Sequence, residues 1–421
     1  MNSAAREFQQ DVGVAKPGWA ARITRDRMLK RIAALPAGRL VIEDADGSHV
    51  AGSGQARPEL DAHIRVHHEG FYQALAASGS VGAAESWVRG QWSSPDLVQL
   101  TRLMAANVEV LNRLDDASSF FDRMALRILH TLKRNSRDGS RRNIEAHYDL
   151  GNEMFEQFLD PTMMYSSALF PHDRASLEEA SLAKLDRICQ KLELKTSDHL
   201  VEIGTGWGGM ALHAASRYGC RVTTTTISRE QQEYALKRIA AAGLADRVTV
   251  LLKDYRDLEG QFDKLVSIEM IEAVGHSYLP AYFETCSKLL KPEGLMVLQS
   301  ILIPDQRYSR ALGNVDFIQR YIFPGGFLPC TAEILKQVAQ RSDMQLLDLR
   351  DITQDYARTL EAWRQRFSAG VQKIRSLGYS EDFVRLWDYY FAYCEGGFRE
   401  RAISTAQFLF AKPDWRPSAS P

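Results

Sequence analysis

Apolar and polar positions alternate on two length scales over the larger part of the chain. From residue 170 onward, short apolar runs are separated by longer amphipathic stretches such as REQQEYALKRIAAAG, which ends in a glycine. Strands that alternate with helices in this way are typical of a parallel sheet covered by helices on both faces. We therefore predict an α/β fold with a doubly wound, mostly parallel, seven-stranded sheet. The expected strands are residues 199–204, 221–228, 247–252, 263–270 and 294–303, with weaker candidates at 344–352 and 405–411.

Residues 1–132 have a different pattern, and we expect a smaller, mainly helical domain there. A hairpin is expected around IEDADGSHV, followed by helical stretches rich in alanine and leucine. The clearest helix is SSFFDRMALRILHTLKR, with apolar residues on one face and basic residues on the other. Residues 133–142, KRNSRDGSRR, follow it as a polar linker with five basic residues and one acidic residue. Residues 143–421 form the second expected domain.

The basic amphipathic helix and the basic linker allow two interpretations. Together they suit contact with a membrane surface, because apolar burial and attraction to anionic headgroups add. On this interpretation, residues 1–132 are a lipid- or membrane-associated domain. The alternative is a helix packed on its own domain, with a solvated run of charge beyond it.

Composition narrows the class of protein. The formal net charge of -1 over 421 residues gives no reason to expect nucleic acid as the main partner. The five cysteines are scattered and form no CxxC pair, which favours free thiols in a reducing compartment over a disulfide framework or a metal site. The N-terminus lacks the apolar segment of a secretory signal, and no apolar run is long enough to span a bilayer. We expect a cytoplasmic protein without a bound metal.

A glycine-rich stretch, VEIGTGWGG, follows the first predicted strand of the sheet. Gly204, Gly206 and Gly209 have the G-x-G-x-x-G spacing, in which missing side chains let the backbone approach a nucleotide. Glu202 places a carboxylate beside this loop, which suits a cationic amino-acid portion and disfavours a pyrophosphate. No acid follows the second strand at TTTTISREQ, where an NAD site would hold its ribose. These features favour S-adenosylmethionine over a dinucleotide.

Several separate motifs occur in an order that resembles one known family. These are NIEAHYDLGNEMFEQFLDPTMMYSSALF, LVEIGTGWGG, TTISREQ, SIEMIEAVGHSYLPAYFETCSKLLKPEGLMVLQSILIPDQRY, FIQRYIFPGGFLP and YARTLEAWRQRF. Together they resemble the cyclopropane-fatty-acyl-phospholipid synthase family of S-adenosylmethionine-dependent enzymes, over roughly residues 143–411. The resemblance implies a Rossmann-like class I methyltransferase fold for residues 143–421, and a homodimer.

The resemblance also implies two sets of site residues. The positions matching cofactor contacts are Tyr165, Ser166, Glu202, Gly204, Gly206, Thr226, Gln231, Tyr255 and Arg256. Family members hold a bicarbonate ion beside the sulfonium methyl group. The positions matching its cage are Ser167, Glu272, Gln299, the backbone of Ile301, and Tyr356. Two of these depart from the common pattern, which has a thiol in place of Ser167 and a histidine in place of Gln299.

The reaction that the resemblance implies explains this choice of groups. An isolated alkene is a weak nucleophile, so it must be pressed against the sulfonium methyl group with water excluded. Methyl transfer leaves a carbocation, which carboxylates, carbonyls and aromatic faces can stabilise. A base must then remove a proton from the new methyl group before the ring can close, and bicarbonate is such a base.

We therefore expect transfer of the one-carbon unit of S-adenosylmethionine to the cis double bond of an unsaturated acyl chain in a membrane phospholipid, giving a cyclopropane fatty acid. The enzyme would be peripherally associated with the inner face of the membrane. Loss of the anion at Ser167, or removal of a proton from a different carbon, would instead give a methyl-branched or methylene product without ring closure. Two further functions stay open, namely N-methylation of a small amine and lipid binding without catalysis.

Overall fold

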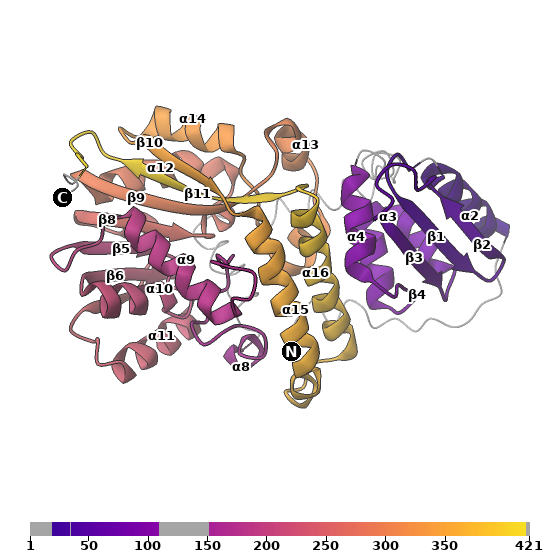
Figure 1. Ribbon diagram of the computed structural model, residues 1–421, viewed down its shortest axis with the longest axis horizontal. Helices are drawn as coiled ribbons and strands as arrows, with labels where there is room; N and C mark the ends of the chain where they lie inside the picture. Colours follow the sequence, from indigo (N-terminus) through magenta and orange to yellow (C-terminus); the bar gives the residue numbers. More distant parts are fainter. Residues whose placement is uncertain (1–18, 34, 109–150, 418–421) are drawn as a thin grey trace. The chain divides into compact units, whose positions relative to one another are not determined.

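The computed structural model describes residues 19–33, 35–108 and 151–417 (Figure 1). The chain divides into two compact units. Unit 1 comprises Met1–Leu132, Gly313–Pro324 and Leu360–Ala402, and unit 2 comprises Lys133–Leu312, Gly325–Thr359 and Ile403–Pro421. The predicted boundary at residue 132 lies outside the described residues, and two later segments also belong to unit 1. The predicted basic helix and the basic linker lie outside the described residues.

Unit 1 combines helices with a small sheet. Its four strands have the order β2-β1-β3-β4, and β1 and β2 form the hairpin predicted from IEDADGSHV, with Asp44 opposite Gly47. Two long-range hydrogen bonds join helices from its early and late segments. Thr101 Oγ1 donates to Ala392 O, and Trp87 Nε1 donates to Arg385 O. The elements are α2 (Trp19–Ile32), β1 (Arg39–Asp44), β2 (Gly47–Ala51), β3 (Asp61–Val66), α3 (Gly70–Val88), β4 (Trp92–Ser93), α4 (Leu97–Ala106), η6 (Ile318–Ile322) and α16 (Glu381–Arg399).

Unit 2 is built on the predicted seven-stranded sheet, in the order β10-β11-β9-β8-β5-β6-β7. The ladders between β9, β8, β5, β6 and β7 are parallel, whereas β11 runs antiparallel to both β9 and β10. All seven predicted strands are present. They are β5 (His199–Ile203), β6 (Arg221–Thr226), β7 (Val248–Leu252), β8 (Phe262–Ile268), β9 (Leu290–Leu302), β10 (Gln345–Asp351) and β11 (Ser404–Ala411).

Helices and short turns of helix connect these strands. Helix α11 confirms the one predicted at REQQEYALKRIAAAG: Ser228 caps its first turn, and Gly243 follows it with a φ of 69°. Helix α15 begins in unit 2, and its remainder belongs to unit 1. The other elements are α8 (Asn152–Phe155), α9 (Leu177–Lys191), α10 (Gly209–His213), η1 (Ala214–Tyr218), α11 (Arg229–Ala241), η2 (Tyr255–Asp257), η3 (Ile271–Ala273), η4 (His276–Tyr278), α12 (Leu279–Leu289), η5 (Asp305–Arg307), α13 (Tyr308–Leu312), α14 (Thr331–Arg341) and α15 (Thr353–Ser376).

Alternate residues of the sheet face two separate cores. On one face, Leu200 and Val266 pack with α9, α10 and α11, and on the other, Val201 and Leu265 pack with α12 and α14 (Figure 1). The strands are therefore buried on both faces, which is why they appear as nearly continuous apolar runs. Within the described residues, no helix is both long enough and apolar enough to cross a membrane.

Candidate functional site

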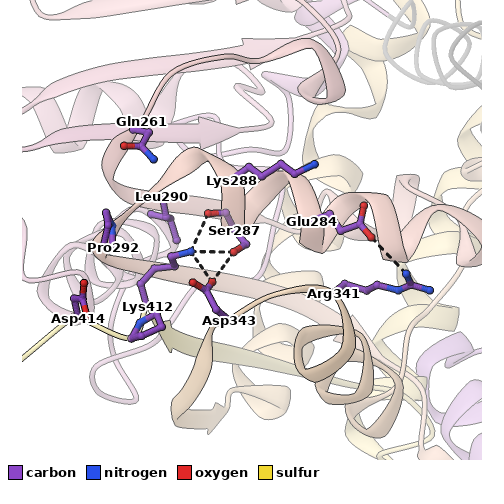
Figure 2. Close-up of a pocket in the computed structure, with 11 residues that line it drawn as sticks. Gln261, Glu284, Ser287, Lys288, Leu290, Pro292, Arg341, Asp343, Lys412 and Asp414 are labelled. Carbon is purple, nitrogen blue, oxygen red and sulfur yellow. Dashed lines mark hydrogen bonds and ion pairs between the residues drawn. The ribbon is translucent and has the colours of Figure 1, made fainter.

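The carboxyl ends of β5, β6, β8 and β9 bring most of the predicted site residues to one edge of the sheet. Doubly wound sheets place their ligands at this edge. A surface cavity of about 490 Å³ lies at the other end of the strands, where Gln261 precedes β8 and Leu290 begins β9 (Figure 2). There Lys412 reaches between Ser287 and Asp343 and bonds to both. This cavity is thus separate from the candidate site.

The glycine loop turns sharply between β5 and α10. Gly204 and Gly206 have φ values of 102° and 51°, in the left-handed region that favours glycine. A Cβ atom on Gly206 would meet no heavy atom of the described residues within 4 Å, so the missing side chain leaves space among them. Gly209 serves packing instead, because a Cβ atom there would lie 2.6 Å from Thr162 O. The loop offers partly exposed backbone at Gly204 and Gly206 to a ligand.

Glu202 lies buried at the start of this loop, with 3% of its surface exposed. Burial raises the pKa of its carboxyl to about 8. Its Oε2 is buried and has no hydrogen-bond partner among the described residues. A buried oxygen without a donor costs about 1–3 kcal/mol unless a ligand supplies one. The ammonium group of S-adenosylmethionine is such a donor, so these residues fit that cofactor.

The other predicted cofactor positions follow the next two strands. Thr226 ends β6, and its hydroxyl donates to Gln231 Oε1 over 2.8 Å. Tyr255 begins the turn of helix after β7, and its ring lies edge-on to that of Tyr282, with centroids 5.5 Å apart. Arg256 is held by two hydrogen bonds to Asp254, of 2.8 and 2.6 Å. These groups therefore occupy the same edge of the sheet as the glycine loop.

The two serines of MMYSSALF have different contacts. Ser166 Oγ accepts a hydrogen bond from the buried Lys184 Nζ over 2.6 Å. Ser167 Oγ donates to the neighbouring Ala168 carbonyl, whereas the Ser167 backbone N–H donates to Glu269 Oε1 over 2.9 Å. The contact with Glu269 is made by the backbone of Ser167, so it does not depend on whether the side chain at this position is a hydroxyl or a thiol. Tyr165, just before them, packs its ring edge-on against Phe155.

Glu269 occupies the centre of the groups that were expected to hold bicarbonate. Its Oε1 accepts from Ser167 N at 2.9 Å and from Gln299 Nε2 at 2.7 Å, and its Oε2 accepts from Tyr356 Oη at 2.9 Å. Burial raises the pKa of this carboxyl, and these hydrogen bonds limit the rise. The donors expected to bind a separate anion are already bonded to a side chain. The described residues do not fit a bicarbonate cage of the expected kind.

Glu272, also expected in that cage, binds the backbone beside it. Its Oε1 accepts from Ile301 N at 2.6 Å and from Ser300 Oγ at 2.9 Å. Burial, together with the nearby charge of Glu269, raises the pKa of Glu272 to about 8. Its Oε2 is buried and has no hydrogen-bond partner among the described residues. Glu272 and Glu269 are thus two neighbouring buried carboxyls whose titrations are coupled.

Comparison with known proteins shows which family this chain belongs to. The family model described as "Mycolic acid cyclopropane synthetase" matches residues 135–408. The chain belongs to this family. The tuberculostearic acid methyltransferase UfaA1 of Mycobacterium tuberculosis is 36% identical over 93% of this chain and 92% of its own. The cyclopropane-fatty-acyl-phospholipid synthase of Escherichia coli K12 is 40% identical over 83% of this chain and 88% of its own.

A solved structure within the family has the same fold. The mycolic acid cyclopropane synthase CmaA1, complexed with SAH and CTAB, is 30% identical to this chain with a TM-score of 0.61. The match covers 65% of this chain and 98% of that one. The class I methyltransferase fold predicted from the sequence is therefore confirmed.

Three residues of the site were missed by the sequence analysis. Glu269 follows the last residue of β8, and only the second glutamate of the IEMIE motif was selected. Lys184 lies on the apolar face of α9. A buried lysine needs a partner, so its position among apolar residues could have identified it from the sequence. Gln407 lies opposite Gln299 in the β11–β9 ladder and donates to its Oε1 at 3.0 Å. The feature of the sequence that could have identified Gln407 is a polar residue inside an otherwise apolar strand.

Proposed function

We propose that the protein transfers the one-carbon unit of S-adenosylmethionine to the cis double bond of an unsaturated acyl chain in a membrane phospholipid, giving a cyclopropane fatty acid. One observation carries the proposal. In a chain of this family, a glycine loop lies at the same sheet edge as a buried cluster of carboxyl groups, and a buried oxygen of Glu202 beside that loop has no hydrogen-bond partner among the described residues. The first suits a cationic cofactor, and the second suits proton removal.

The proposed residue roles follow the contacts. Bound S-adenosylmethionine supplies an electrophilic methyl group. Glu202 accepts from its ammonium group, and the backbone at Gly204 and Gly206 lies along its amino-acid portion. The remaining predicted cofactor residues line the same edge: Tyr165, Ser166, Thr226, Gln231, Tyr255 and Arg256.

The carboxyl cluster stands next to the reacting carbon atoms in this proposal. Ser167 and Gln299 orient Glu269, and Tyr356 donates to its other oxygen. Glu272 fixes the backbone at Ile301. Buried negative charge at this point stabilises a carbocation on the acyl chain, because the low local dielectric strengthens the attraction.

The proposal treats bicarbonate, membrane association and the homodimer, which were also expected from the sequence, in three different ways. Bicarbonate does not enter it, because the donors expected to hold that ion bind Glu269. Association with the membrane surface does enter it, since a phospholipid acyl chain must be drawn from a bilayer. The homodimer implied by the family resemblance stays a prediction.

A second product has one observation in its favour. UfaA1, which matches 93% of this chain, is named as a tuberculostearic acid methyltransferase. A methylene fatty acid, or a methyl-branched one that keeps an alkene, would arise from the same methyl transfer if the carbocation lost a proton to form a double bond and the ring did not close. The two products share a mass gain but differ in whether an alkene remains.

The deciding experiment uses purified protein, S-adenosylmethionine and vesicles of phosphatidylglycerol with cis-monounsaturated chains. Acyl products are identified by mass spectrometry before and after ozone cleavage, which cuts alkenes only. We expect a gain of one CH2 unit in a product that resists ozone. The same gain in an ozone-sensitive product would establish the methyl-branched or methylene alternative. Vesicles with saturated chains are the control, and turnover of small amines without any acyl change would refute both lipid functions.

A further inference from the structure

The donors around Glu269 come from three distant segments of the chain. Ser167 lies before α9, Gln299 is in β9, and Tyr356 is in the first turns of α15. Together they direct two N–H groups and one hydroxyl at a single carboxylate. We infer that Glu269 replaces bicarbonate in this protein, as a covalently attached base that takes the proton from the newly transferred methyl group. This inference rests on the proposed function and deepens it.

The arrangement of the donors is that of an anion site. Gln299 is held with its NH2 group toward Glu269, because Gln407 Nε2 donates to the Gln299 carbonyl oxygen at 3.0 Å. The Gln299 NH2 group also reaches the Ser167 carbonyl at 3.3 Å. Hydrogen bonds to an ionised acceptor are stronger than neutral ones, so three of them select a carboxylate. A free anion would have to displace Glu269 from all three donors.

The backbone of Glu269 provides independent support. Its φ is 50°, in the left-handed region that costs a non-glycine residue roughly 1–2 kcal/mol. The Glu269 backbone N–H donates to the backbone carbonyl oxygen of Gln299 at 2.8 Å, which helps to fix this conformation. Such strain persists only where surrounding contacts hold it, and it is enriched at functional sites. Here it turns the residue after β8 so that its carboxylate meets the three donors.

Buried charge nearby suits this role. Lys184 is buried, which lowers the pKa of its ammonium group to about 8, while the nearby carboxyl groups of Glu269, Asp160 and Glu202 limit the fall. Burial also raises the pKa of Glu269. A carboxylate with a raised pKa is a stronger base than an exposed one, and the hydrogen bonds from its donors favour the ionised form.

The chemical step balances without an added base. The alkene electron pair forms the bond to the methyl carbon, and the carbon–sulfur bond breaks with its electron pair on sulfur. Glu269 then accepts a proton from the new methyl group. The electron pair of that carbon–hydrogen bond closes the ring onto the cationic carbon. Glu269 is left as the neutral acid and returns its proton to solvent before the next turnover.

The first test uses the wild-type protein. Activity on monounsaturated phosphatidylglycerol vesicles is measured in buffers freed of carbon dioxide under argon, with and without added bicarbonate. We expect rates that agree within about twofold, since general-base catalysis of 10²–10⁴-fold is supplied from within the chain. A wild-type rate that requires bicarbonate would overturn the inference.

The second test uses two variants of Glu269. In bicarbonate-free buffer, Glu269→Gln and Glu269→Gly should each be at least about 100-fold slower than wild type. Glycine suits the left-handed backbone and opens the space of the carboxylate, so bicarbonate should raise the rate of Glu269→Gly at least tenfold. Glu193→Gly is the matched control, because Glu193 also has a φ of 50° but lies beyond α9, outside the site. Circular dichroism checks that each variant is folded.

A binding measurement keeps this inference separate from the proposed function. Carbon-13-labelled bicarbonate, followed by NMR without any lipid, should bind Glu269→Gly and not the wild type. Specific binding to the wild type, or full activity of Glu269→Gln without an added anion, would overturn the role of Glu269. Absence of any acyl product from the wild type would refute the proposed function instead, whatever the bicarbonate result.

Discussion

Tyr356 Oη donates a hydrogen bond to Glu269 Oε2 over 2.9 Å, across 87 residues of sequence. The same start of α15 is fixed to the YSSALF segment at two other points. Thr359 Oγ1 accepts from Ala168 N at 3.0 Å, and Asp355 Oδ1 accepts from Phe170 N at 2.8 Å. The position of the Tyr356 hydroxyl is therefore set by the backbone of the segment that carries Ser167.

The Tyr356→Phe variant tests this contact. Phenylalanine keeps the ring packing and removes one of three donors to the Glu269 carboxylate. A hydrogen bond to a charged group contributes about 1.5–3 kcal/mol, so we expect the lipid-modifying rate to fall on the order of 10- to 100-fold. Calorimetry should find the affinity for S-adenosylmethionine unchanged, because Tyr356 is not among the predicted cofactor contacts.

Tyr218→Phe is the control for this variant. Tyr218 also donates to a carboxylate, that of Asp186, but it lies at the end of η1 and outside the site. Its loss should leave the rate within about twofold of wild type, in line with other substitutions that touch no reacting group. Equal losses of rate in the two variants would show that Tyr356 acts only through the stability of the fold.

Gln407→Leu tests the orientation of the Gln299 amide. Without the Gln407 donor, the Gln299 carbonyl oxygen is buried without a partner, and the amide can rotate so that oxygen faces Glu269. We expect about a tenfold lower rate and a free energy of unfolding lower by about 1–3 kcal/mol. Rates of Gln299→Leu, Gln407→Leu and the double variant should be non-additive, because the two amides act as one unit. Strictly additive effects on the rate would contradict this coupling.

The sheet could be predicted from the sequence because each strand keeps its apolar pattern locally. The glycine loop with Glu202 could be predicted for the same reason, since strand, loop and helix are contiguous. The content of unit 1 could not be predicted, because periodicity does not show that residues 313–324 and 360–402 belong to the same compact unit as the N-terminal segment. Likewise, only one hairpin of its four-stranded sheet was predicted.

The central carboxylate was missed for a physical reason. Glu269 and Glu272 are three residues apart in IEMIE, and nothing in that pattern shows that the first has a positive φ. The resemblance directed attention to Glu272 and to a separate anion. The contacts show that the expected donors at positions 167, 299 and 356 do converge, but on Glu269. Which acceptor they meet depends on backbone geometry that no residue spacing encodes.

Acid should destabilise unit 1 through Asp44. Arg25 donates to both Asp44 oxygens, at 2.7 and 3.0 Å, and Tyr72 Oη donates at 2.7 Å. Burial opposes the charged form, but these bonds outweigh it and lower the pKa of Asp44 from 3.8 to about 2. A carboxyl with a lowered pKa stabilises the fold above pH 4, and about 2 kcal/mol is lost as the pH falls toward 2. Amide exchange of β1 should show this loss in wild type.

The Asp44→Asn variant should already lack that stability at pH 7 and should change less between pH 5 and pH 3. Asp61→Asn is the control, because Asp61 pairs with Arg39 in the same sheet but is about half exposed. Exposed ion pairs contribute about 0–1 kcal/mol, so this variant should follow the wild type. An acid response of Asp44→Asn as steep as that of wild type would assign the loss to other groups.

Cofactor binding should release a proton from Glu202. The pKa of its buried carboxyl is about 8, so about nine tenths of the free protein carries the neutral acid at pH 7. An ammonium group beside Oε2 favours the carboxylate, so binding of S-adenosylmethionine should expel close to one proton. Affinity should then rise with pH between 6 and 8. Calorimetry in buffers of different ionisation enthalpy measures this release, and Glu202→Gln should abolish it; an undiminished release would place the titrating group elsewhere.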